Sequence, residues 1–119
     1  MLEVVVMFNG KPVCVAEAAD SFLSRGVGLL GRRTLLERRG LLIQRCGSIH
    51  TWFMRFAIDV VYLGKDGVVT KTRRDMQPFR MSFGGKGTLD VLELPAGTIA
   101  RLGIERGCSL ELRPVTRKG

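Results

Sequence analysis

The sequence predicts a mainly β protein with minor α+β character: one compact antiparallel barrel or sandwich-like domain of six or seven short strands and one or two short helices. Apolar runs of three to eight residues, broken by Gly, Pro and charge, indicate short strands. The regular alternation of strands with long helices that is typical of a parallel α/β sheet is missing. At this length the chain suffices for one core, so residues 1–119 are predicted to form a single domain with a basic C-terminal tail at residues 114–119.

The first element is a β-hairpin. Residues 3–8 are apolar and β-branched, Asn9-Gly10 is a strong signal for a two-residue turn, and residues 11–16 resume the apolar run. Pro12 has no N–H to donate to a neighbouring strand, so the second strand is expected to lie at a sheet edge there or to begin just after it.

A short helix is predicted after the hairpin. From residue 18 to residue 30 the apolar spacing becomes helical, with Asp20 or Ser21 available as the N-cap and Gly31 as the C-terminal stop.

The centre of the chain predicts a buried hairpin. After a short strand at residues 41–43, residues 56–63 are the most apolar segment, a turn follows at residues 65–67, and residues 68–72 return as the partner. Both faces of the longer strand are apolar, which is typical of a central strand. One face holds Ile58, Val60 and Tyr62, and the other holds Ala57, Asp59, Val61 and Leu63.

The last third is predicted to contain a long exposed loop at residues 73–88, because this segment is polar, basic and glycine-rich. Its run at residues 84–87 could cradle a phosphate, although a flexible loop is the favoured interpretation. A strand at residues 89–94, a helical turn at residues 95–102 and a strand at residues 109–113 complete the chain.

Charge and cysteine content narrow the function classes. The formal net charge is +8, carried by 14 arginines and 5 lysines that are scattered along the sequence, so no dedicated nucleic-acid stripe is visible. Cys14, Cys46 and Cys108 are odd in number and form no Cys-x-x-Cys pair, which argues against disulfides and a zinc knuckle. No apolar stretch approaches the ~20 residues that span a bilayer, and Glu3 stands where a secretory peptide would be basic. We therefore expect a cytoplasmic protein without a membrane segment, a metal or a cofactor.

Two acids stand out as candidate ligand-binding residues. Asp59 interrupts an apolar strand, where a charge must be paired or hydrogen-bonded, and Arg55, Arg32 or His50 are candidate partners. Glu93 lies between two leucines and should also need a pairing or hydrogen-bonding partner, although this expectation is weaker than for Asp59. A structural pair is at least as favoured as a catalytic carboxylate for Asp59.

The segment at residues 48–56 is a candidate groove because it gathers aromatic, basic and thioether side chains. Its members with predicted ligand contacts are His50, Trp52, Met54 and Arg55. Filling of the core is the simpler interpretation of the same residues. Cys46 and His50 are the only plausible soft metal pair, with Asp59 as a third ligand, but Gly47-Ser48 makes the required helix doubtful.

Several blocks of the sequence resemble one known family. They are Gly28-Leu29-Leu30-Gly31-Arg32, Gly40-Leu41-Leu42-Ile43, the segment at residues 50–63 that begins His50-Thr51-Trp52, and Val91-Leu92-Glu93-Leu94-Pro95-Ala96-Gly97. In this order they resemble domain of unknown function family 192. The resemblance implies a compact, mostly β prokaryotic domain without a known activity. It also points to Arg32, Met54, Asp59, Glu93 and Gly97, while Ala57 stands where that family usually has proline.

Three functional hypotheses remain. The first is a non-catalytic module that binds a small ligand or a protein segment through the residues at 50–56, Arg32 and Asp59. The second is an enzyme that uses Asp59 with Cys46 or His50 as an acid–base or metal site. The third and least favoured is weak nucleic-acid binding through residues 65–88 and the basic tail.

Overall fold

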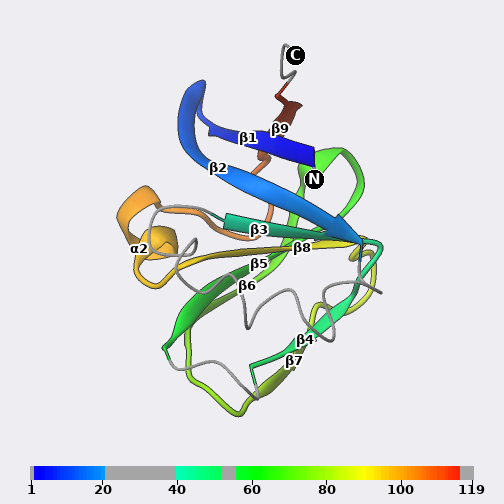
Figure 1. Ribbon diagram of the computed structural model, residues 1–119, viewed down its shortest axis with the longest axis vertical. Coiled ribbons are helices and arrows are strands. Elements are labelled where there is room, and N and C mark those ends of the chain that lie inside the picture. Colours follow the sequence, from blue (N-terminus) through cyan, green and yellow to red (C-terminus); the bar gives the residue numbers. More distant parts are fainter. Residues whose placement is uncertain (1, 21–39, 52–55, 116–119) are drawn as a thin grey trace.

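A seven-stranded open sheet forms the centre of the molecule (Figure 1). The computed structural model describes residues 2–20, 40–51 and 56–115. Within them the strand order is β6-β5-β8-β3-β2-β1-β9. These strands are β1 (Leu2–Phe8), β2 (Lys11–Asp20), β3 (Gly40–Gln44), β5 (Ile58–Leu63), β6 (Val69–Met76), β8 (Asp90–Pro95) and β9 (Glu111–Pro114). Three further elements are the paired strands β4 (Ser48–His50) and β7 (Met81–Phe83) and the short helix α2 (Thr98–Leu102). The turn η3 (Lys65–Gly67) connects β5 to β6.

The predicted mainly β class is confirmed. The sheet is not closed into a barrel, because β6 and β9 stand at opposite ends of its strand order, and layers on both faces make it sandwich-like. It is also not antiparallel throughout, since β2 and β3 run parallel, with Ala16 opposite Gly40 and Asp20 opposite Gln44. The other neighbouring pairs of the described sheet are antiparallel.

The β1–β2 hairpin forms as predicted. Asn9 and Gly10 both have positive φ angles, 53° and 75°, which is the geometry of the two-residue turn that matches the twist of a hairpin. Pro12 pairs with Met7 beside a bulge, and β3 joins β2 only from Ala16 onward. The proline therefore lies where β2 has no second described neighbour to which it would have to donate a hydrogen bond.

Strand β5 divides its side chains between two cores, as its sequence predicts. All six of its residues are buried. We call the side on which Val61 and Leu63 pack with Ile99 of α2 the α2 face. We call the side on which Ile58, Val60 and Tyr62 pack the β4–β7 face, because Ile49 of β4 joins them there.

Two predicted elements differ from the structure. Residues 18–20 continue β2 instead of starting a helix, because Ala18 pairs with both Leu2 and Leu42; the rest of that predicted helix lies outside the described residues. The predicted loop at residues 73–88 contains the end of β6 and all of β7. The hydrophobic pattern of the sequence does not predict strand β7, because its polar residue, Ser82, points inward while its apolar neighbours point outward.

The remaining predicted elements are present. The strands predicted at residues 41–43, 89–94 and 109–113 correspond to β3, β8 and β9, and the helical turn at residues 95–102 contains α2. The predicted tail begins later than expected, since Pro114 pairs with Val4 and the Val115 N–H donates to the Glu3 carbonyl at 2.9 Å. Residues 116–119 lie outside the described part of the chain.

Candidate functional site

Asp59 is fully buried on the α2 face, and main-chain amides satisfy its carboxylate. One oxygen, Oδ1, accepts a hydrogen bond from the Asp75 N–H at 2.9 Å, and Oδ2 accepts one from the Ile99 N–H at 2.8 Å. Hydrogen-bonding partners are therefore present, and the two that the described structure shows are main-chain amides. Because Ile99 lies in the first turn of α2, whose amides carry partial positive charge, Asp59 fixes the start of that helix to the sheet.

Glu93 is fully buried on the opposite face of the sheet. It lies opposite Leu41 of β3 and Val60 of β5, both members of the β4–β7 face. Neither carboxyl oxygen has a hydrogen-bond partner in the described structure. Burial raises the pKa of Glu93 from 4.5 to about 8, because an apolar environment disfavours the charged form. At neutral pH the side chain is therefore mostly a neutral acid.

Other polar groups accompany Glu93 on the β4–β7 face. Burial raises the pKa of the Tyr62 phenol, and the Ser82 hydroxyl and the Arg73 charge oppose this rise, while Cys46 and Glu93 add to it. Neither hydroxyl group forms a hydrogen bond of regular geometry within the described residues. The Cys46 thiol donates to the Ser48 carbonyl at 2.9 Å. This face thus contains a cluster of buried polar groups inside an otherwise apolar core.

Of the other predicted site residues, the structure describes Cys46, His50 and Glu93. Cys46 belongs to the β4–β7 face, on the other side of the sheet. His50 is half-buried at the end of β4, opposite Met81, and alternation along the strand turns it away from the side of Ile49. The described residues contain no group of three or more His, Cys, Asp or Glu that could hold a metal ion. Arg32, Trp52, Met54 and Arg55 lie outside the described part of the chain.

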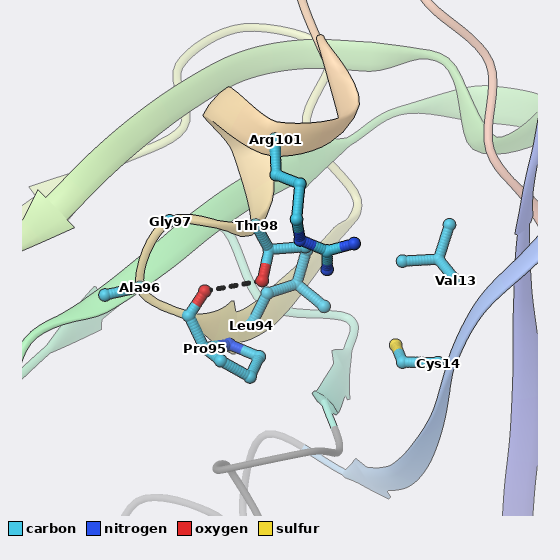
Figure 2. A pocket seen from close by; sticks show the side chains of 8 residues that line it. All are labelled: Val13, Cys14, Leu94, Pro95, Ala96, Gly97, Thr98 and Arg101. Atoms are coloured by element: carbon cyan, nitrogen blue, oxygen red, sulfur yellow. Dashed lines mark hydrogen bonds between the residues drawn. The ribbon is translucent and has the colours of Figure 1, made fainter.

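An open pocket of about 540 Å³ lies beside α2, between β2 and the turn that joins β8 to α2 (Figure 2). We call it the α2 pocket. Its lining residues are Val13, Cys14, Leu94, Pro95, Ala96, Gly97, Thr98 and Arg101. Figure 2 shows Val13 and Cys14 on one side and the guanidinium of Arg101 reaching over Thr98 on the other. The walls thus combine apolar side chains with polar groups, and Arg101 contributes the single charge of the described lining set.

Thr98 and Cys14 contribute a hydroxyl and a thiol to the α2 pocket. The Thr98 hydroxyl donates to the Pro95 carbonyl at 2.7 Å, which ties the turn to α2. Burial raises the pKa of the Cys14 thiol to about 11, although a backbone hydrogen bond from Gly40 opposes this effect. A thiol with such a pKa is a poor nucleophile at neutral pH. The described residues that line the pocket include no histidine or carboxylate side chain.

Sequence reasoning missed Cys14, Thr98 and Arg101. Between two valines, Cys14 looks like a small core residue, and Arg101 looks like any exposed arginine of a helix. The useful signal was the turn that precedes Thr98 and Arg101. Gly97 adopts a left-handed conformation, with φ 93°, and the family resemblance had pointed to this glycine.

Fold and site together define a small, mainly β protein with an acid buried on one face of an open sheet and a pocket on the other. The chain belongs to domain of unknown function family 192 (DUF192), described as "Uncharacterized ACR", whose model matches residues 4–112. No helix in the described residues has the length and apolar character needed to cross a membrane.

One curated protein and two solved structures are similar to this chain. The UPF0127 protein PF1050 of Pyrococcus furiosus is 32% identical over 107 residues, which cover 87% of this chain and 91% of that protein. A protein of unknown function from Novosphingobium aromaticivorans has a similar crystal structure, with a TM-score of 0.75, 25% identity, and coverage of 92% of this chain and 83% of that chain. A second crystal structure, of a "putative transcription regulator" from Sinorhizobium meliloti, has a TM-score of 0.78, 24% identity, and coverage of 93% and 92%. The latter likeness establishes the fold.

Proposed function

We propose that the protein is a non-catalytic module that binds a small ligand in the α2 pocket. The observation that carries this proposal is an open pocket of about 540 Å³, lined by both apolar and polar groups, with one cation at its rim. This volume lies within the roughly 300–1,000 Å³ of ordinary small-molecule sites. The described residues of its lining include no paired nucleophile and base, which favours binding over turnover.

The lining indicates the chemical class of the ligand. Arg101 is exposed and forms no ion pair with any described residue, so its guanidinium is available for a forked contact with an anion. Val13, Leu94 and Pro95 supply apolar contact area in the same pocket. These features fit a small organic acid, a carboxylate or a phosphate ester, with a short apolar body.

The test is a thermal-shift and NMR screen of small carboxylates and phosphate esters, each paired with its neutral amide or alcohol. The acids should raise the melting temperature and shift the methyl resonances of Val13 and Leu94, and the neutral partners should not. Arg101→Gln should abolish the effect. Arg106→Gln is the matched control, because Arg106 is an exposed arginine outside the pocket.

Two results would refute the binding-module proposal. One is that no acid binds the parent protein. The other is that the best binder is chemically converted at a rate that Arg101→Gln abolishes, since this would make the pocket an active site. An enzyme based on Asp59 and Cys46 is the weaker alternative, because the two side chains belong to opposite faces of the sheet.

The cellular setting is part of the same proposal. Cys14, Cys46 and Cys108 are all free thiols, which suits the reducing interior of a cell. We therefore expect the protein in the cytoplasmic fraction, and immunodetection after fractionation of the native host tests this expectation.

A further inference from the structure

Strand β7 presents an apolar outer surface. Ser82 is buried, while Met81 and Phe83 on either side of it are 52% and 60% exposed, and Phe79, just before the strand, is 66% exposed. Large apolar side chains grouped on a protein surface commonly mark a site of interaction. The β4–β7 pair lies at the end of the molecule far from β1 and β9, away from the α2 pocket (Figure 1).

Each of the two exposed phenylalanines has a cation beside it. The Lys71 ammonium group donates to the Phe83 carbonyl at 2.7 Å, and the Arg80 guanidinium donates to the Phe79 carbonyl at 3.3 Å. Neither cation forms an ion pair with a described residue, since both bind neutral carbonyls. We call Phe79, Met81 and Phe83, with Lys71 and Arg80, the β7 platform. It combines exposed rings with positive charges that have no counter-charge.

The platform is held in place before anything binds. Thr51, which is buried, accepts the Phe79 N–H at its carbonyl at 2.8 Å. Its hydroxyl oxygen accepts the Arg80 N–H at 3.0 Å, and the hydroxyl donates to the Gln77 carbonyl at 2.6 Å. These bonds fix the connection between β6 and β7, so little conformational entropy remains to be lost when a partner contacts the rings.

We propose that the β7 platform binds single-stranded nucleic acid. A nucleotide carries a flat base and a phosphate a short distance apart. Each exposed phenylalanine, with a cation bound at its main-chain carbonyl, offers the complementary pair of groups. The net charge of +8 attracts a polyanion from a distance. A duplex would satisfy the cations but would leave the rings unused, because its bases are stacked inside. An acidic peptide has no flat rings to stack on the phenylalanines.

The experiment is a fluorescence-anisotropy titration of the full chain with a labelled oligouridine of about 12 nucleotides, within the usual range for one such domain. Binding should weaken steeply as salt increases and should exceed binding to a duplex of equal length. Removing both rings, in Phe79→Ala with Phe83→Ala, should weaken binding roughly 10-fold or more. Lys71→Gln should reduce the slope of log affinity against log salt by about 1.

Matched controls separate the platform from general attraction to a basic protein. Leu89→Ala removes an exposed apolar side chain outside the platform, and Arg106→Gln removes an exposed charge elsewhere. Neither should change oligouridine affinity by more than about 2-fold. The altered side chains are on the surface, so circular dichroism and the melting temperature should remain those of the parent.

Four results would overturn the proposal. The first three are the absence of binding, oligouridine affinity that is unchanged when both phenylalanines are removed, and equal affinity for duplex and single strand. A fourth is preferential binding to vesicles of anionic phospholipid that the ring substitutions abolish while oligouridine binding persists. That outcome would assign the same rings to a membrane surface.

Discussion

Replacement of Glu93 by Gln should make the protein more stable at alkaline pH. Glutamine has nearly the shape of the protonated acid and no charge at any pH. Burial raises the carboxyl pKa from 4.5 to about 8 in the folded protein, which corresponds to about 5 kcal/mol between the two protonation states. Because the folded-state pKa is the higher one, the parent protein keeps its full stability below pH 4.5. It loses up to this amount of stability as the pH rises toward about 8.

Urea unfolding of the parent and the Glu93→Gln variant from pH 4 to pH 9 measures this effect. The difference between the two free energies of unfolding cancels the titration of all other groups. It should be small at pH 4 and grow to several kcal/mol in favour of the variant by pH 9, with about 5 kcal/mol as the upper value. Glu105→Gln is the control, because Glu105 is exposed. If the Glu93→Gln and parent curves run parallel, the ionised carboxylate has a partner and the reasoning is wrong.

Three further predictions concern stability and use the same urea assay. Asp59→Asn should cost about 1–3 kcal/mol, because one main-chain N–H would then face an amide NH₂, whereas Asp66→Asn at an exposed turn should be nearly neutral. Gly84→Ala should cost about 1–3 kcal/mol, because a Cβ there would lie 2.5 Å from the ring of a buried tyrosine. Gly47→Ala, with open space at the same atom, is its control. Thr51→Val should cost about 1–3 kcal/mol, because it leaves the part-buried Arg80 N–H of the β6–β7 connection without an acceptor. Equal stability of any of these three variants and the parent would contradict the contact assigned to that residue.

The sequence predicts the local elements of this fold better than their pairing. Asn9-Gly10 and the alternation in β5 are signals that extend over a few residues, and the structure contains both. The parallel pairing of β2 with β3 depends on contacts between segments separated by about twenty residues that the structure does not describe. No turn signal in the sequence encodes it. Strand β7 was missed for a different reason, because its apolar residues face outward and reverse the expected pattern.

The same limit applies to the site. In sequence, Asp59 and Glu93 look alike, since each is one acid in an apolar strand. They differ in what faces them across space. Amides of Asp75 and Ile99 approach Asp59 from two later segments of the chain, while the residues opposite Glu93 on β3 and β5 are the apolar Leu41 and Val60. Which acid receives hydrogen bonds depends on these distant contacts and not on the neighbours in sequence.

The two proposed binding surfaces are held in place in the same way. Each depends on a buried polar residue that contacts no ligand itself. Asp59 fixes α2, and α2 carries Arg101 to the rim of the α2 pocket. Thr51 fixes the connection that carries Phe79 to the β7 platform. The two anchors lie on separate segments, and their surfaces lie on separate parts of the molecule. A substitution that loosens one surface should therefore leave the other intact, so small-ligand binding and oligonucleotide binding are expected to be separable by mutation.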